Sequence, residues 1–412
     1  AHHLLEPLSK YRYLLSALGL FLIFSFVWLK RRKFSLNKLN FFFSILLLVY
    51  IVIDAVSMIR MAVKNESTPA ATASIQCREC ARPDIYFLLF DEYTSSRCLK
   101  EFWKYDNYAF DSALQARGFH IIPDSRGNYN STPFSLASIL NMEYVRGVKD
   151  FKASTVNDFA SCIGLIKNSK VVDFLDRGGY EVLNYSVFDL KGQPSIVDQS
   201  FLPLKVKLIT DQTLYSRIIK DLGHLLIVGK FELKFLSEKL IYSSLRSNTI
   251  FTKELLKVSR QKADHPRFVY AHFFMPHQPF YFDSTGHARD KKILLAERNH
   301  FTLNPYLQYV KFTNGKALQL VDSILENNAT PPIIMLMGDH GFRRDTAVAN
   351  FDYLFMNMNA IYLPDGNYAP FYDSISGVNQ FRVLFNSEFK QNLQLLNDST
   401  ILVVAKRPGQ NF

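Results

Sequence analysis

An aspartate and a histidine stand side by side at Asp339 and His340, where the apolar run PIIMLM (332–337) gives way to glycine. A carboxylate and an imidazole are ligands that Zn²⁺ and Mn²⁺ accept in proteins. On a regular strand the two side chains would face opposite ways, but just past a strand end, between Gly338 and Gly341, both can face one ion. A capped turn is the alternative interpretation, so the pair indicates a metal site only if other ligands join it.

A second feature with chemical potential is Thr132, in the stretch NSTPFSLASIL. We expect Thr132 to cap a buried helix, because Thr is a frequent N-cap residue and Pro133 suits the first helical position. The N-terminus of a helix carries about half a unit of positive charge, which favours an alkoxide. A metal ion beside the hydroxyl would favour it further and complete an activated nucleophile. A threonine that only caps its helix is the alternative.

Polar side chains of similar kinds follow two other apolar runs. IYFLLF ends in Asp91 and Glu92, and RFVYAHFF carries His272 and leads to His277. Ligands of α/β sheets bind at the carboxyl ends of strands, so one site could collect these groups together with the Asp-His pair. His272 could equally be a core residue of its strand, and that choice stays open.

The elements that must position these residues follow from the hydrophobic pattern. Short apolar runs alternate with longer segments of helical pattern, which predicts an α/β domain with a mostly parallel central sheet flanked by helices. The predicted strands are 85–90, 119–122, 180–185, 267–274, 332–337 and 359–363. Helices are predicted after Thr132 and over YLQYVKFTNGKALQLVDSILE, which precedes the strand at 332–337.

Two apolar stretches near the N-terminus have the length of transmembrane helices. Residues 13–29 carry no charge and residues 39–59 carry only Asp54, and a helix needs about 20 such residues to cross a bilayer. The loop between them, KRRKFSLNK, is basic, as cytoplasmic loops are. We therefore expect a multi-pass anchor in the cytoplasmic (inner) membrane at 1–60, a linker at 61–82 and an extracytoplasmic, periplasmic domain at 83–412.

The charge and the cysteine content limit which classes of partner and metal site we expect. The chain of 412 residues has a net charge of +11, but it has no long Lys/Arg run outside the membrane loop, so we expect no nucleic-acid partner. A basic balance beside a bilayer fits anionic lipid head groups better. Cys77 and Cys80 form one CxxC without a second to complete a zinc site, and a disulfide and free thiols stay equally open.

Together the motifs resemble the alkaline phosphatase superfamily, in the membrane-anchored sulfatase-like branch of lipoteichoic acid synthase and the lipid A phosphoethanolamine transferases. FDEY (90–93) is similar to the family's metal-binding strand end, and STPFSLASIL (131–140) to its nucleophile segment. HFFMPHQPF (272–280) is similar to its histidine segment, and GDHGFR (338–343) to its metal-binding Asp-His pair. The motifs occur in the family's order, between residues 83 and 365.

The resemblance implies a sulfatase-like domain and a phosphotransferase that uses a divalent metal, Zn²⁺ or Mn²⁺. The implied metal ligands are Glu92, Thr132, Asp339 and His340, with Thr132 as the catalytic nucleophile and His277, His272 and Arg343 as candidate substrate-binding residues. In the implied ping-pong reaction a membrane phospholipid donates a phospho-head group, of phosphoethanolamine or phosphoglycerol type, to Thr132. An envelope glycan or lipid then accepts it.

Two departures from the family pattern keep other functions open. Formylglycine sulfatases need Cys or Ser followed by x-Pro-x-Arg, whereas position 135 is Ser. The phosphoethanolamine transferases carry a further His after the Asp-His pair, and this chain has none after His340. Arg343 and Arg344 are candidates to replace it. The alternatives are a hydrolase of phosphate or sulfate esters at the same site, and a catalytically silent domain that binds an envelope glycan or lipid.

Overall fold

The computed structural model divides into two compact units, residues 1–71 and residues 72–412. The residues that it describes are 20–21, 23–25, 27, 37, 40–52, 82–197, 241–297, 302–328, 330–343 and 350–406.

In the first unit, residues 40–52 are helical and expose apolar side chains, among them Phe41, Leu47 and Ile51. Within the described stretches, none of the helices combines the length and the hydrophobicity that crossing a bilayer requires. The predicted span at 39–59 is described only over 40–52. The predicted span at 13–29 and the predicted linker at 61–82 lie mostly outside the described residues.

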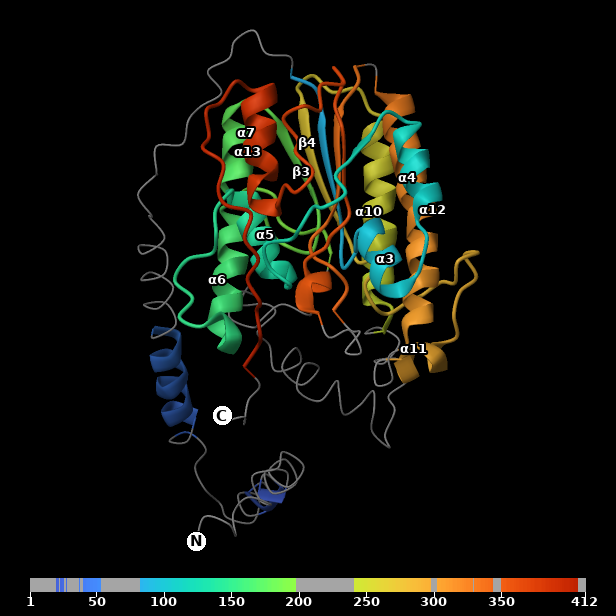
Figure 1. Cartoon of the computed structure of the whole chain (residues 1–412). Helices are drawn as coiled ribbons and strands as arrows, with labels where there is room; N and C mark the ends of the chain where they lie inside the picture. The colour runs from blue at the N-terminus through green and yellow to red at the C-terminus, as the bar shows by residue number, and fades with distance from the viewer. Residues whose placement is uncertain are drawn as a thin grey trace. The chain divides into compact units, whose positions relative to one another are not determined.

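The second unit is built on a six-stranded sheet with the strand order β2-β6-β5-β1-β4-β3 (Figure 1). The strands are β1 (Ile85–Phe90), β2 (His120–Ile121), β3 (Glu181–Tyr185), β4 (Arg267–Phe273), β5 (Ile333–Gly338) and β6 (Asn359–Tyr362). β1 runs parallel to β4 and β5, and β3 is parallel to β4, whereas β6 is antiparallel to β5 and β2 is antiparallel to β6. The carboxyl ends of β1, β3, β4 and β5 therefore meet at one edge of the sheet.

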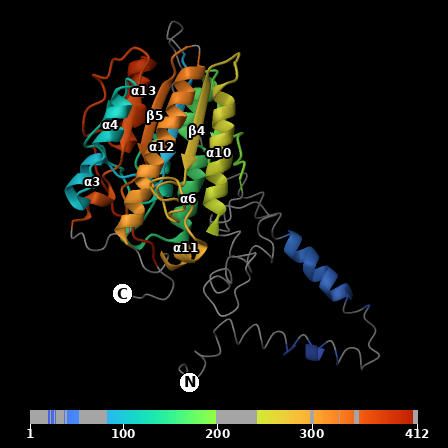
Figure 2. The same cartoon turned by 90° about the vertical axis from the view of Figure 1, so that its right-hand side faces the viewer.

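Helices cover both faces of this sheet (Figures 1 and 2). One layer contains α5 (Thr132–Asn141), α6 (Val156–Lys167), α7 (Lys170–Arg177) and α13 (Gly377–Glu388). The other contains α3 (Ser96–Trp103), α4 (Tyr108–Gln115), α10 (Ser243–Ser259) and α12 (Leu303–Asn327). The shorter elements are α11 (Lys291–Glu297) and the 3₁₀ helices η2 (Phe151–Ala153) and η5 (Phe351–Leu354).

The predicted α/β domain with a mostly parallel central sheet is confirmed. Each of the six predicted strands is present within one residue of its predicted bounds, and the two predicted helices are α5 and α12. All six residues of β1 are buried. A strand that is covered by helices on both faces needs apolar residues at every position, which is why the continuous run IYFLLF was readable as a strand.

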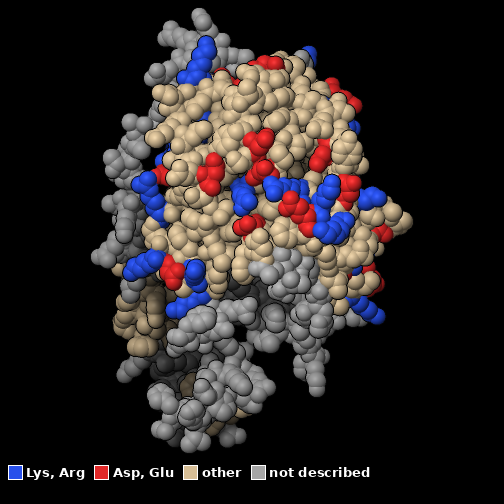
Figure 3. Space-filling view, viewed as in Figure 1, with Lys and Arg blue, Asp and Glu red and all other residues tan. Residues whose placement is uncertain are grey.

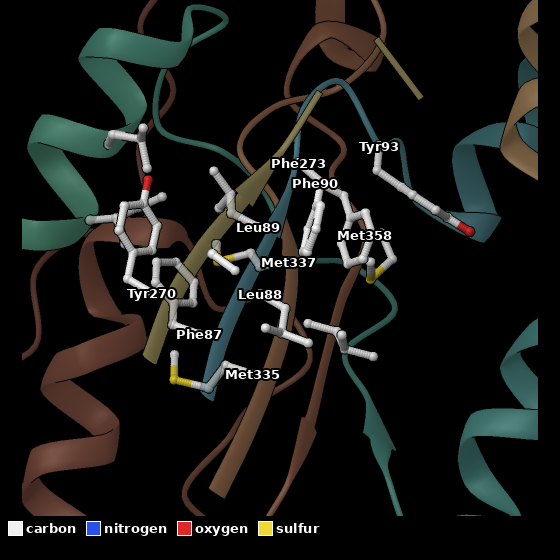
Figure 4. Packing of buried hydrophobic residues seen from close by; sticks show 14 of the residues in the cluster. Phe87, Leu88, Leu89, Phe90, Tyr93, Tyr270, Phe273, Met335, Met337 and Met358 are labelled. Carbon is white, nitrogen blue, oxygen red and sulfur yellow. The ribbon is translucent and has the colours of Figure 1, made fainter. Parts of the chain in front are cut away.

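The core consists of the interdigitated side chains of the central strands (Figure 4). Phe87, Met335 and Tyr270 lie on one side of the sheet, and Phe90 and Met358 lie on the other. The ring of Phe87 stacks on that of Tyr270 with centroids 5.6 Å apart. Because successive side chains alternate between the faces, Leu89 and Met337 share the face of Phe87, and this face is the one that α5 and α13 cover.

A buried ion pair lies at the opposite, amino edge of the sheet. Arg267, at the start of β4, donates from Nε and Nη2 to Asp84 Oδ2, at 2.8 Å and 2.5 Å. The Arg267 backbone N–H donates to Asp84 Oδ1, at 2.8 Å, and Nη1 donates to the carbonyls of Val258 and Gln261. The charge of Asp84 is therefore balanced by the chain itself.

On the surface, acidic and basic side chains are intermixed over the face seen in Figure 3. The described ion pairs of the domain include Lys170 with Glu143 at 2.8 Å and Lys191 with Asp173 at 3.3 Å.

Candidate active site

Three parallel strands bring polar residues to the carboxyl edge of the sheet. Phe90, the last residue of β1, lies level with Phe273 of β4 and Gly338 of β5. The next residue on β1 is therefore Asp91 and the next on β5 is Asp339, in neighbouring positions. Their carboxylates continue the side-chain alternation onto the face that α5 covers.

Asp91, Asp339 and His340 form a buried cluster of potential metal ligands. One ligand atom from each residue lies within 4.8 Å of the others. Asp91 is 4% exposed and the other two are 0% exposed. Buried carboxylates need compensating partners, so a cluster of this kind is a place where a cation would be stabilised.

The hydrogen bonds of His340 leave one of its ring nitrogens free to bind a metal. Nδ1 lies 2.8 Å from the Gly341 carbonyl, which can only accept, so Nδ1 carries the proton. Burial lowers the pKa of His340, so the ring is neutral and Nε2 presents a lone pair. That nitrogen lies 3.1 Å from Asp339 Oδ2, which has no hydrogen-bond partner among the described residues. A backbone carbonyl that orients a histidine in this way is typical of metal sites.

The backbone around the Asp-His pair is held close to its neighbours. Asp339 Oδ1 accepts from the N–H groups of Glu92 and His340, both at 3.0 Å. A Cβ atom added at Gly338 would lie 2.2 Å from the Tyr93 carbonyl oxygen, and one added at Gly341 would lie 1.9 Å from that of Tyr353. The two glycines are therefore required for close packing of the backbone.

Thr132 lies at the border between this cluster and the solvent. Its Oγ1 is 3.3 Å from His340 Nε2 and donates to Asp91 Oδ1 at 3.5 Å. The N-cap of α5 is Ser131, and Thr132 is the first helical residue, so the prediction that Thr132 caps the helix is wrong. Its hydroxyl is directed to the acidic cluster instead of a backbone N–H, and the residue is only half-buried.

Glu92 has a partner of its own on the other side of the cluster. It adopts a left-handed backbone conformation with φ of 60°, which is unfavourable for a residue with a Cβ atom. Its Oε1 accepts from Arg343 Nε at 2.6 Å. Burial would raise the pKa of Glu92, but the charges of Arg343, His277 and His340 outweigh it and lower the pKa to about 2.

The pKa of Asp91 is shifted in the opposite direction from that of Glu92. Burial raises its pKa well above the usual range, and the neighbouring carboxylates of Asp339 and Glu92 raise it further. The family motif indicates Asp91 only as a neighbour of the metal ligand. The alternation of β1 is a usable signal, because Asp91 follows Phe87 and Leu89 on the face of α5. Glu92 as a ligand stays a prediction, and the geometry favours Asp91.

The two histidines of the HFFMPH segment occupy different environments. His272 is fully buried on β4, its ring stacked on Phe188 with centroids 5.9 Å apart. Its Nε2 lies 3.9 Å from Asp91 Oδ2, and burial lowers its pKa to about 4, so it is neutral. His277 is half-buried, in the loop that follows β4, and its Nδ1 contacts the Gln278 carbonyl.

The charges and lone pairs of the site fit a divalent cation. The three buried carboxylates of Asp91, Glu92 and Asp339 are balanced, among the described ion pairs with arginine or lysine, only by Arg343. Asp339 Oδ2 and Glu92 Oε2 are buried without a hydrogen-bond partner in the described part of the chain. A divalent ion would offset this excess of negative charge and occupy the lone pairs that face one another.

Comparisons with known proteins give similarity at the level of the fold. Neither a protein-family model nor a curated protein matches the chain. A solved structure of the C-terminal periplasmic domain of EcEptC from Escherichia coli, in complex with Zn, is 9% identical, with a TM-score of 0.43 over 75% of this chain and 83% of that one.

Two further solved structures are similar to the chain to a comparable degree. The soluble domain of lipooligosaccharide phosphoethanolamine transferase A from Neisseria meningitidis is 15% identical, with a TM-score of 0.41 over 76% of this chain and 90% of that one. The phosphonate monoester hydrolase of Agrobacterium radiobacter is 13% identical, with a TM-score of 0.43 over 74% and 73%. The chain is similar to these three solved structures only at low identity, and the superfamily that its motifs resemble stays a prediction.

Proposed function

We propose that this chain is a metal-dependent transferase that moves a phospho-head group, of phosphoethanolamine or phosphoglycerol type, from a membrane lipid through Thr132 to a cell-envelope acceptor. The position of the Thr132 hydroxyl carries the proposal. It lies on the first residue of α5, 3.3 Å from His340 Nε2, and it is half-buried between the solvent and the acidic cluster. A substrate can reach a hydroxyl in this position, and the groups that would activate it are adjacent.

Asp91, Asp339 and His340 would hold the metal ion, with Thr132 at the border of the set. When bound there, Zn²⁺ or Mn²⁺ acts as a Lewis acid that favours the ionised hydroxyl and neutralises phosphoryl oxygens.

The chemistry has two balanced halves. First, Thr132 Oγ1 forms a bond to phosphorus while the bond between phosphorus and the lipid oxygen breaks, and the hydroxyl proton ends on the departing lipid alcohol. Second, an acceptor hydroxyl forms a bond to phosphorus while the bond to Thr132 breaks, and the acceptor proton returns to Thr132. The acceptor is a glycan or lipid of the envelope, and water in its place would give hydrolysis.

Arg343 and His277 are the proposed substrate-binding residues. The Arg343 side chain is 32% exposed. It donates to Glu92 and, from Nη1, to the Asn130 carbonyl at 3.3 Å, so it is fixed near Thr132 with further N–H groups that suit phosphoryl oxygens. The charge of His277 acts on Glu92, which indicates the same neighbourhood. Because His272 is 0% exposed beside Asp91, its position favours support of Asp91 over contact with a substrate.

The first unit supplies the proposed membrane attachment. The helical residues 40–52 expose apolar side chains that a lipid environment would cover, and the basic residues between 30 and 38 indicate a cytoplasmic loop. We place the anchor in the cytoplasmic (inner) membrane and the catalytic unit on its outer side. Tethering keeps the site close to a lipid donor.

The decisive experiment is mass spectrometry of the Thr132 peptide after incubation of the protein with labelled phospholipid and Zn²⁺ or Mn²⁺. We expect an adduct whose mass identifies the transferred group, and no adduct in Thr132→Ala. The matched control is Thr155→Ala, which removes the N-cap threonine of α6 and should leave the adduct intact. A Thr132→Ala protein with the turnover of the wild type on a lipid donor would exclude the covalent route.

A second experiment separates transfer from hydrolysis and from a silent domain. Chromogenic phosphodiester and sulfate esters are incubated with and without an acceptor alcohol. Product that contains the acceptor supports transfer. Release of the chromogenic group at the same rate with and without the acceptor, and with no product that contains the acceptor, supports a hydrolase. A protein that takes up neither Zn²⁺ nor Mn²⁺ and turns over neither substrate favours a silent binding domain.

A further inference from the structure

The last described segment of the chain, residues 390–406, forms a strap without helices or strands of its own. It begins at the end of α13 and can be followed in Figure 1 toward the mark of the C-terminus. It is held against the domain by isolated parallel bridges between Ile401 and Tyr129 and between Ala405 and Ser154. Val403 is buried to 7% exposure. The strap therefore lies beside the loop that leads into Thr132.

Three asparagines bind the backbone of the strap in the same way. The amide oxygen of each accepts the N–H of one strap residue, and its amide nitrogen donates to the carbonyl of that same residue. The pairs are Asn386 with Leu393 at 2.7 and 2.9 Å, Asn379 with Leu396 at 2.9 and 2.7 Å, and Asn130 with Val403 at 2.7 and 3.3 Å. A side-chain amide has the donor and acceptor geometry of a neighbouring strand, so these contacts fix which residue of the strap lies at each place.

The third pair differs from the others, because Asn130 belongs to the loop that leads into Thr132. It lies two residues before Thr132 in the sequence. Its backbone carbonyl accepts from Arg343 Nη1 at 3.3 Å, and Arg343 in turn contacts Glu92. One residue thus joins the strap by its side chain, the proposed phosphate-binding arginine by its carbonyl, and the nucleophile through the chain.

A second asparagine of the same loop, Asn128, strengthens this connection. The Asn128 carbonyl accepts the N–H of Ile401 at 2.8 Å. Its side chain donates to Ser376 Oγ and to the Ser399 carbonyl and accepts from the N–H of Val378. Strap contacts on both sides of Tyr129 leave the loop little freedom before α5 begins.

We propose that Asn130 is a positioning residue, through which the strap fixes the orientation of the Thr132 hydroxyl and of Arg343. The proposal rests on the proposed function of Thr132. A displacement of about 1 Å in a reacting group is sufficient to reduce a rate by about a hundredfold, so a loop fixed from two directions has a direct effect on turnover. Metal uptake depends on Asp91, Asp339 and His340, which a variant at Asn130 leaves in place, and should change less.

The test compares Asn130→Ala with Asn386→Ala in the full chain. The second variant removes the same pair of hydrogen bonds at the far end of the strap, next to Leu393. We expect kcat to fall about tenfold to a hundredfold in Asn130→Ala, with bound metal within about twofold of wild type. Asn386→Ala should lose a similar amount of thermal stability with kcat unchanged. Equal losses of kcat in both variants, or an unchanged kcat in Asn130→Ala, would overturn the proposal.

A second readout does not depend on the reaction. Hydrogen exchange of the backbone amides of residues 126–134 should become faster in Asn130→Ala and stay at the wild-type rate in Asn386→Ala. If the wild-type protein has no transferase or hydrolase activity, the proposed function fails, and this measurement still decides whether the strap orders the loop. Exchange that is unchanged in Asn130→Ala refutes the positioning role.

Discussion

Asp84 and Asp91 stand at the two ends of the same strand, β1, and they are stabilised in opposite ways. The Asp84 side chain is 13% exposed and receives three hydrogen bonds from Arg267. Asp91 is 4% exposed and lies beside two further carboxylates, Asp339 and Glu92. The charge at the amino edge of the sheet is balanced within the chain, and the charge at the carboxyl edge is not.

This contrast separates buried charges that are structural from buried charges that are functional. Burial of an ion is unfavourable, and an arginine of the same chain, hydrogen-bonded to the carboxylate, offsets that cost permanently. The neighbouring carboxylates of Asp339 and Glu92 raise the pKa of Asp91 and destabilise the metal-free fold. The presence of three carboxylates at this place therefore needs a reason other than stability. A divalent ion supplied from outside would be such a reason, and the two edges should therefore respond differently to mutation and to chelation.

The largest effect is expected from Asp339→Asn. The substituted amide keeps an oxygen for the N–H groups of Glu92 and His340, and its nitrogen can donate to His340 Nε2. We expect turnover to fall about a thousandfold or more, which corresponds to about 4 kcal/mol, because metal binding is lost. The metal-free protein should be as stable as the wild type or more stable, because one of the crowded charges is gone.

Turnover assays and chemical unfolding in EDTA check this prediction. A metal-free Asp339→Asn protein that unfolds more easily than metal-free wild type would show that the carboxyl edge is structural after all.

The next largest effect is expected at the other edge. Arg267→Met leaves Asp84 Oδ2 and the carbonyls of Val258 and Gln261 without the donors of the arginine side chain. We expect a loss of about 3 kcal/mol in the free energy of unfolding, since the removal of one partner leaves an uncompensated buried charge. Urea unfolding measures it, and the kcat of the folded fraction should not change. In the double variant with Asp84→Asn we expect part of the loss to be recovered.

Metal removal should have a smaller effect on stability, and this effect should depend only on the carboxyl edge of the sheet. A ligand present at about 100 times its dissociation constant stabilises the native state by about 2.7 kcal/mol. Chelation should therefore lower the melting temperature of wild type and of Arg267→Met by similar amounts and leave Asp339→Asn unchanged. Differential scanning fluorimetry with and without EDTA checks it, and an equal response of all three proteins would argue against this site as the one that binds the metal.

The smallest effect is expected for an ordinary surface ion pair, the one between Glu143 and Lys170. Burial raises the pKa of Glu143, but hydrogen bonding and charge from Lys170, with Arg146, outweigh it and lower the pKa below its usual value. A lowered folded-state pKa contributes stability above the unfolded-state pKa of about 4.5 that is lost as the pH falls through the folded value. Both partners are partly exposed, so Glu143→Gln should lose only about 0.5 kcal/mol at pH 7.

Unfolding free energies of wild type and Glu143→Gln between pH 3 and pH 7, at low and high salt, test this prediction. We expect the difference to shrink toward acid pH and in high salt. A difference that grows as the pH falls would contradict a stabilising role of the ionised Glu143 carboxylate.

Several features were determined by the sequence alone, because their causes are local. Continuous apolar runs predict the buried parallel strands, and the segment after Pro133 predicts α5 by its apolar residues. The polar residues that end these runs must meet at one edge, since parallel strands share a direction. Asp339 and His340 were selected on that basis and Thr132 as a residue at the start of a helix, and their side chains lie together in the structure.

The tertiary structure decided what depends on a single turn or on distant contacts. Past a strand end the direction of a side chain is set by local dihedral angles, and φ of 60° at Glu92 directs that carboxylate to Arg343 while Asp91 joins the cluster. The partners Asp84 and Arg267 are 183 positions apart in the sequence, and the partners Asn130 and Val403 are 273 positions apart. Pairings at such separations arise only from the packed fold, because no local propensity specifies them.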